Sequence, residues 1–229
     1  MSPAARRFVV ALLSLCAADA SAEMSVCADP SLSVAADSPA ATARVCTAAV
    51  AAKAPLASCG LVQRAPITLL VLDEVHGISD HCAGLYRRGS DEIALLAPSL
   101  AARTLPQDSS FAGLAPDLYF DSLVTHEMAH ALMDQALDGA PRCSADAEYI
   151  AYAMQLDSLP DSASAMVYAG TRDDGPVPAD SLNAFVLFMN PDLFARLAWG
   201  HFAAPGNGCD VITDILSGAR TFATPTLRK

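Results

Sequence analysis

The sequence is poor in charge and in aromatic side chains: 17% of its 229 residues are charged and 6% are aromatic. With 53% hydrophobic residues, this excludes a wholly disordered chain. Basic residues are the scarcer sign, 14 against 25 acidic, and the formal net charge of −11 argues against nucleic acid and anionic membrane surfaces as partners. Beyond the N-terminus no run of about 18 apolar residues occurs, so we expect no transmembrane segment in the mature chain. The length suits a single domain with a real core.

Residues 1–22 have the pattern of a signal peptide. The basic pair Arg6-Arg7 precedes a short apolar run over 8–18, and small residues stand at Ala20 and Ala22. We therefore expect cleavage after Ala22 and export, in which case the mature chain is periplasmic or extracellular.

The sequence contains no Cys-x-x-Cys pair, which argues against a structural zinc knuckle and against a thioredoxin-like redox site. Removal of the signal peptide leaves an even number of cysteines, and in an exported chain these predict up to three disulfides. Spacing alone cannot choose the pairing, so all six remain candidates: Cys27, Cys46, Cys59, Cys82, Cys143 and Cys209.

Residues 23–229 show an α+β pattern, with the strands early and close together and helices after them. This order favours a small, mixed or antiparallel sheet, within residues 38–97, over a doubly wound one. The apolar and turn-forming patterns predict, in order, a loose lead-in over 23–37, a helix from Ser38 to about Leu56, a buried strand over Ile67–Leu72 and a hairpin of strands at 83–86 and 93–96.

The second half of the chain is predicted to be mostly helical. Asp117, Ser144 and Asp210 are candidate N-caps, and Asn190-Pro191 looks like a cap followed by a first-turn proline. The predicted elements are short helical or loop pieces up to Pro116, a helix over 117–138, a helix over 144–159, a polar loop over 161–180 and a helical C-terminal part over 180–218.

The chemistry is concentrated in the sequence His126-Glu127-Met128-Ala129-His130, an H-E-x-x-H motif. On a helix, residues four apart lie about 40° apart around the axis, so both imidazoles point the same way. Two neutral imidazoles one turn apart suit Zn²⁺. Glu127 stands next to them and can act as general base on a zinc-bound water. The motif therefore predicts one catalytic zinc ion with an open coordination position.

A third ligand must come from elsewhere in the chain. Met133 and Ala136 occupy the positions where a metzincin has glycine and histidine, which excludes that class. Glu148 is the only glutamate after the motif, lies on the next predicted helix and is our choice of ligand. Asp173, in a Gly-Thr-x-Asp string, is the competing choice.

With His126, Glu127, His130 and Glu148, the sequence resembles the gluzincin class of zinc metallopeptidases. The resemblance implies a zincin-like fold, peptide or protein substrates, and zinc held by the two histidines and the downstream glutamate. It also implies that an upstream edge strand lines the substrate cleft, a part that Ile93–Leu96 could play. It covers roughly residues 67–156 in layout.

Three further residues are candidates for support of the reaction. Asp134 lies one turn after His130 and could orient it, as carboxylates commonly do for zinc histidines. Tyr152 and His201 are candidates for the donor that stabilises the transition state, the role that a downstream Tyr or His has in the resembling enzymes. The absence of an obvious donor favours an alternative: a disulfide-stabilised exported binding protein with a non-catalytic zincin-like metal site.

Overall fold

The computed structural model describes residues 23–76, 82–169 and 176–223. Five strands form one mixed sheet in the order β1-β2-β3-β5-β4. The inner strands β2, β3 and β5 are parallel, and the edge strands β1 and β4 each pair antiparallel with a neighbour. The α+β class and the mixed sheet are confirmed. The strands are β1 (Glu23–Val26), β2 (Leu32–Ala36), β3 (Ile67–Leu72), β4 (Gly84–Arg87) and β5 (Glu92–Leu96).

The predicted loose lead-in over 23–37 is wrong, because this segment supplies β1 and β2. Leu32 and Val34 are fully buried, and β2 pairs with β3 from Leu32 to Ala35. The alternation of Leu32, Ser33 and Val34 was the available signal. It was weak because the strand is short and its partner β3 lies more than thirty residues further along the chain.

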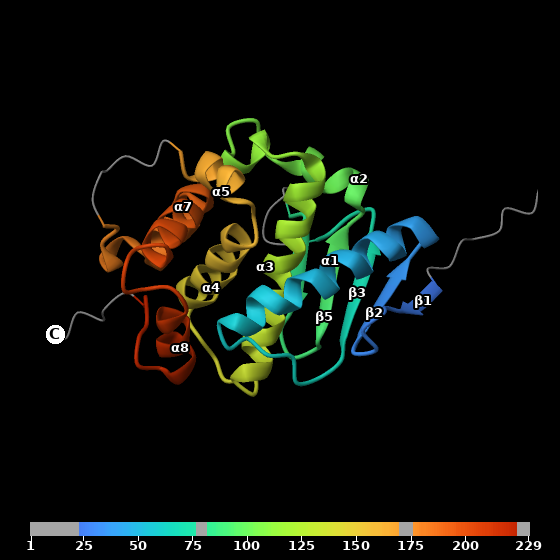
Figure 1. Ribbon diagram of the computed structural model, residues 1–229, viewed down its shortest axis with the longest axis horizontal. Coiled ribbons are helices and arrows are strands. Elements are labelled where there is room, and N and C mark those ends of the chain that lie inside the picture. The colour runs from blue at the N-terminus through green and yellow to red at the C-terminus, as the bar shows by residue number, and fades with distance from the viewer. Residues whose placement is uncertain (1–22, 77–81, 170–175, 224–229) are drawn as a thin grey trace, which may run out of the picture.

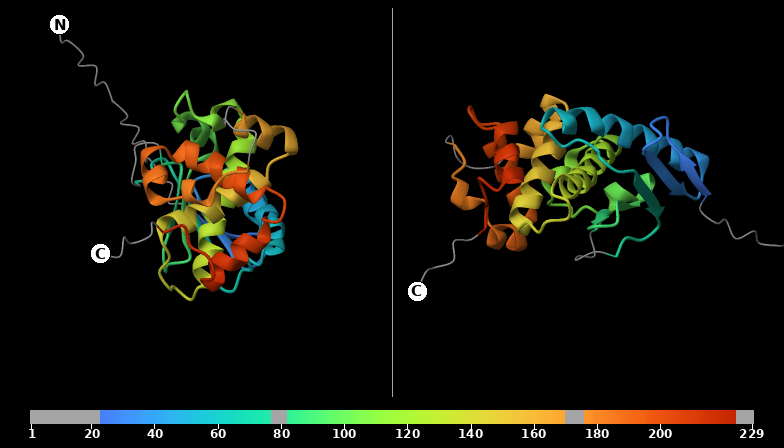
Figure 2. Two further views of the ribbon diagram at one scale, coloured as in Figure 1. Left: turned by 90° about the vertical axis from the view of Figure 1, so that its left-hand side faces the viewer. Right: turned by 90° about the horizontal axis from the view of Figure 1, so that it is seen from below.

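Two long helices pack on the same side of the sheet (Figures 1 and 2). Helix α1 (Pro39–Ser58) packs against β2, and helix α3 (Pro116–Ala136) packs against β4 and β5. The Ser38 side chain caps α1 by accepting a hydrogen bond from the N–H of Ala41, and the helix begins where the sequence predicts it. A connection of short pieces, α2 (Pro98–Ala101), η1 (Ala102–Thr104) and η2 (Ser110–Gly113), leads into α3.

Helix α3 is a central helix rather than an amphipathic surface helix. Fourteen of its 21 residues are buried, and they lie on all its faces. The sheet and α1 cover one side, and α4 (Ser144–Asp157) covers another (Figure 1). A helix that is covered on several sides loses the two-faced pattern of a surface helix. The segment with the H-E-x-x-H motif is therefore held in the middle of the fold.

The remaining helices lie on the side of α4 away from the sheet (Figure 1). The predicted polar loop over 161–180 is wrong in its first part, because residues 161–168 form α5, with Asp161 in its first turn and a buried Val167. The helical C-terminal part thus begins well before residue 180. Its elements are α5 (Asp161–Tyr168), η3 (Ala179–Ser181), α6 (Ala184–Met189), α7 (Pro191–Phe202) and α8 (Cys209–Ser217).

Three of the four predicted helix caps are wrong. Asp117 and Asp210 lie in the first turns of α3 and α8, where a carboxylate favours the positive end of the helix dipole. The N-cap of α4 is Cys143, whose sulfur accepts the N–H of Asp146, and Ser144 is the first helical residue. Asn190 does cap α7 ahead of Pro191, as predicted.

Two disulfides connect distant parts of the chain. Cys27–Cys46 joins the end of the β1 region to α1, and Cys59–Cys209 joins the end of α1 to the start of α8. Cys82 and Cys143 are free, so the predicted maximum of three bridges is not reached in the described residues. None of the described helices is both long and apolar enough to cross a bilayer.

Candidate metal centre

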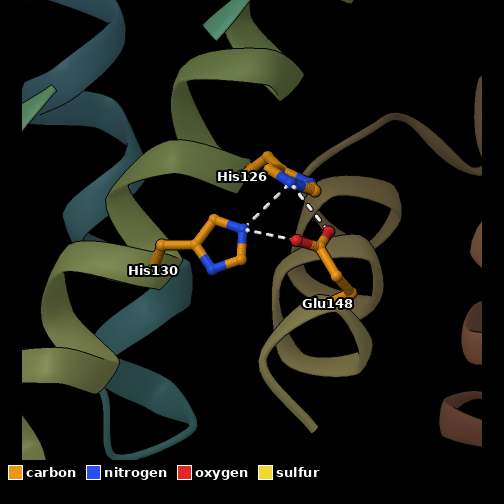
Figure 3. Close-up of side chains that lie close together, drawn as sticks. All are labelled: His126, His130 and Glu148. Carbon is orange, nitrogen blue, oxygen red and sulfur yellow. Dashed lines mark hydrogen bonds and ion pairs between the residues drawn. The ribbon is translucent and has the colours of Figure 1, made fainter. Parts of the chain in front are cut away.

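Two neighbouring helices bring the three predicted ligands together (Figure 3). His126 and His130 lie one turn apart on α3, and their Nε2 atoms are 3.2 Å apart. Glu148 extends from the first half of α4, with Oε1 3.4 Å from His130 Nε2 and Oε2 3.5 Å from His126 Nε2. All three residues turn their donor atoms toward one point, and the group could hold a metal ion.

The spacing of these donors fits a small tetrahedral ion. Ligands about 2.0–2.1 Å from a tetrahedral Zn²⁺ lie about 3.3 Å from one another. The three nitrogen and oxygen separations in the group run from 3.2 to 3.5 Å. The side chains would therefore need little rearrangement to become ligands of such an ion.

Charge coupling within the group keeps its glutamate ionised. Burial alone would raise the pKa of Glu148, but His130 and His126 more than offset this and hold its pKa well below the usual range. Burial also acts to lower the pKa of His130, yet the facing Glu148 carboxylate leaves that pKa raised. Opposite charges at this distance favour the charged form of each partner. The lowered pKa of Glu148 keeps its carboxylate in the ionised form that a metal ligand requires.

A second polar contact determines which nitrogen of His126 faces the centre. The Nδ1–H of His126 donates to the amide oxygen of Gln155, 3.0 Å away. The amide nitrogen of Gln155 in turn donates to Ser122 Oγ at 3.3 Å, which fixes the orientation of the amide. With Nδ1 protonated, Nε2 has its lone pair free. Gln155 was not among the residues predicted from the sequence, and its only signal was its position one turn after Tyr152 and two turns after Glu148 on α4.

Replacement of Gln155 by Leu is expected to weaken zinc affinity roughly 10- to 100-fold, because the orientation and basicity of His126 depend on this hydrogen bond. Competition with a chelating dye measures the change. Gln155→Glu is the matched variant, because a carboxylate still accepts the Nδ1–H, and it should retain most of the affinity. Equal affinity in wild type and Gln155→Leu would show that the contact does not tune the site.

The motif glutamate is held from the other side, by the sheet edge. Glu127 is buried, and its Oε2 accepts the backbone N–H of Tyr86 on β4 at 2.8 Å. The backbone of Gly84 is so close that a Cβ atom there would lie 2.7 Å from Glu127 Oε1. Burial raises the pKa of Glu127, while the two imidazoles and the Tyr86 N–H act in the opposite direction. Glycine at position 84 is therefore what lets the carboxylate lie against the edge strand.

This edge strand differs from the one predicted. Ile93–Leu96 lies in β5, which is internal between β3 and β4, so the strand beside the site is β4. Sequence could show a hairpin but not which of its strands would be the outer one, because that depends on how β5 pairs with β3.

Asp134 attaches the hairpin to α3 instead of orienting His130. Its Oδ2 accepts from the Tyr86 hydroxyl and from the N–H of Gly89, both at 2.8 Å, and Arg88 lies 3.3 Å from Oδ1. These contacts fix the position of β4 over α3. Through Tyr86 they also fix the donor that holds Glu127.

A cleft of about 550 Å³ opens beside His126 and Glu127. Its lining combines the start of β4, the connection before α3, the faces of α3 and α4, and the N-terminal end of α7. Tyr119 and Tyr152 both line it, and neither hydroxyl has a hydrogen-bond partner among the described residues. Tyr152 packs edge-on against His126, with ring centroids 4.7 Å apart. Burial raises the pKa of both tyrosines, so their hydroxyls stay protonated donors.

The other predicted residues lie apart from the centre or outside the described chain. His201 pairs through Nδ1 with the Tyr149 hydroxyl at 2.9 Å and does not line the cleft. Asp173 and the predicted cleavage position at Ala22 fall outside the described residues.

Cys82 also lines the cleft, where its thiol donates to the carbonyl of Gly84, and burial raises the pKa of the thiol. Sequence gave no reason to place Tyr119 or Cys82 beside the metal centre.

Comparison with known protein families gives a match over most of the chain. The model of a family of unknown function, DUF6639, matches residues 32–225. The chain belongs to DUF6639. The matched segment runs from β2 past the end of α8, so the ligand group, Glu127 and the cleft all lie in the part that defines DUF6639 membership. No curated protein and no solved structure matches the chain.

Proposed function

We propose that this DUF6639 protein is an exported zinc-dependent peptidase, in which His126, His130 and Glu148 hold one zinc ion and Glu127 is the general base. The observation that carries the proposal is the close approach of these three side chains: the two Nε2 atoms are 3.2 Å apart, and each lies 3.4 to 3.5 Å from a different oxygen of Glu148. Two imidazoles and one carboxylate form a common protein ligand set of catalytic zinc, which keeps a fourth position open. The resemblance of the motif to gluzincins supports the same reading.

When bound, zinc supplies a Lewis acid that polarises the substrate carbonyl. The chain supplies the rest. Glu127 takes the proton from the attacking water and passes it to the leaving amine, which requires a carboxylate fixed within hydrogen-bond reach of the reacting atoms. The Tyr86 N–H holds Oε2 and leaves Oε1 free for this proton transfer.

Negative charge develops on the carbonyl oxygen during peptide hydrolysis, and a donor aimed at it lowers the barrier. Tyr152 and Tyr119 offer hydroxyls in the cleft that have no hydrogen-bond partner in the part of the chain that the structure describes, and Tyr152 lies against His126, a proposed zinc ligand. Tyr152 is therefore the proposed principal donor. Tyr152 is one of the two donor candidates that the sequence offered, and its place in the cleft weakens the main argument for the non-catalytic alternative.

Export is supported by the cross-links as well as by the leader-like N-terminus. The chain has two disulfides. Disulfides form and persist in oxidising compartments and are rare in reducing ones. A periplasmic or extracellular location is compatible with both observations.

Metal analysis of the purified protein tests the proposal. Wild type is expected to contain about one zinc ion per chain and to hydrolyse peptides. His126→Ala and Glu148→Ala should each retain less than about a tenth of that zinc, since each loses one of three ligands. His76→Ala is the matched control, because this exposed histidine pairs with Glu74 and with no other residue that the structure describes. A wild type free of metal would refute the site, and a zinc-loaded protein inactive on a broad peptide panel would support a binding protein.

A further inference from the structure

One wall of the cleft carries a positive charge that the proposed reaction does not use. Arg196 of α7 is the only lysine or arginine among the described residues that line the cleft. Phe194, on the same helix, packs against Tyr152 with ring centroids 6.3 Å apart, so α7 adjoins the tyrosine next to the metal centre. Arg196 and Glu127 thus line the same cleft from different elements, α7 and α3.

An ion pair with Asp192 positions the guanidinium of Arg196, but the N–H groups of Arg196 have no hydrogen-bond acceptor among the described residues. Its Nε lies 3.5 Å from Asp192 Oδ2, one turn back on α7. Asp192 is itself held: its Oδ1 accepts from the hydroxyls of Ser109 and Ser110 and from the N–H of Ser110, at 2.8 to 3.0 Å. Arg196 Nε is buried without a hydrogen-bond partner, and no described residue accepts from the two terminal nitrogens. A planar fork of donors is therefore available at this wall.

We propose that Arg196 binds the free C-terminal carboxylate of a short peptide, so that cleavage occurs near the C-terminal ends of substrates. A carboxylate is the planar, two-oxygen acceptor that the guanidinium fork matches. The cleft, at about 550 Å³, has the size of a small-ligand pocket and suits a chain end better than a long extended segment. This inference rests on the proposed peptidase function, since it names the substrate class for that site.

The test compares peptides of identical sequence that end in a free carboxylate or in an amide. For zinc-loaded wild type, kcat/KM is expected to be roughly 10- to 100-fold higher for the acid, the effect of one charge-assisted, bidentate contact. Arg196→Gln should bring this ratio close to one, and Arg196→Lys should give an intermediate ratio because it keeps the charge without the fork. Arg103→Gln, at an exposed arginine outside the cleft, should keep the wild-type ratio.

Calorimetry on metal-free protein gives a readout that needs no turnover. Preferential binding of the acid peptide by wild type, lost in Arg196→Gln while its thermal melt shows a folded protein, supports the assignment. A preference that appears only with zinc would place the carboxylate on the metal and overturn it. Equal hydrolysis of acid and amide by wild type would also overturn it, with the peptidase function intact. Arg196-dependent binding without any hydrolysis would refute the peptidase and leave the carboxylate site standing.

Discussion

Glu127→Gln is expected to lower kcat for peptide hydrolysis roughly 10²- to 10⁴-fold, the usual contribution of a positioned general base. The variant should retain zinc, because Glu127 is not among the three residues of the ligand group. It should also retain its place in the fold, because the Gln side-chain oxygen can still accept the Tyr86 N–H that Glu127 accepts at 2.8 Å. The amide cannot take a proton from water, so the loss falls on the chemical step. Steady-state kinetics alongside zinc analysis measures both effects.

Glu74→Gln is the matched control for this experiment. Glu74 is an exposed glutamate that lies outside the cleft, and its neutralisation changes the net charge by the same amount. Its kcat should equal that of wild type. A Glu127→Gln protein with full zinc and full turnover would eliminate Glu127 as the base, and with it the proposed mechanism.

Gly84→Val is expected to lower kcat/KM about 10²-fold with little effect on zinc content, because a displacement of a catalytic group by about 1 Å has an effect of that size. A Cβ at position 84 would lie 2.7 Å from Glu127 Oε1 and 2.8 Å from its Cγ. The side chain that must yield is the carboxylate itself, since the backbone of β4 is held by β5 and by the contacts of Asp134. The change therefore acts on the reaction through the position of Glu127.

Three comparisons distinguish this effect from a general loss of structure. Gly84→Ala should lie between wild type and Gly84→Val. Gly113→Ala is the matched control, because its added Cβ meets only the flexible Met166 side chain, at 3.3 Å. In a Gly84→Ala background, Glu127→Asp should cost less activity than in wild type, because the shorter side chain leaves room for the Cβ. Wild-type kinetics in Gly84→Val would contradict the close packing of these residues.

The part of the site that sequence could predict is the part that one helix determines by itself. His126 and His130 share a face because of helix periodicity. Glu148, on the next helix, could be predicted because it is the only glutamate after them in the sequence and the turn before it lets that helix fold back. Gln155 and Gly84 could not be predicted in the same way. Their roles depend on how α4 and β4 pack against α3, which no local pattern encodes.

The fold shows the same division. Helices with strong local signals, such as the one that begins after Ser38, are where the sequence placed them. The errors fall where tertiary contacts decide: β2 is a strand because β3 pairs with it, and residues 161–168 are helical because Val167 and its neighbours pack into the core. Helix α3 is likewise buried on several sides because the sheet, α1 and α4 all pack against it.

Cys59 and Cys209 are 150 residues apart in sequence, and both helices of the metal centre lie in the segment between these two bridged cysteines. The connection between them includes Gly139 and Pro141, which are exposed. A protease that cuts there would separate the two histidines from Glu148 in sequence. The fragments would nevertheless stay covalently tethered, because one contains Cys59 and the other contains Cys209. A nicked molecule would thus keep the three residues of the proposed metal centre in one covalently linked molecule.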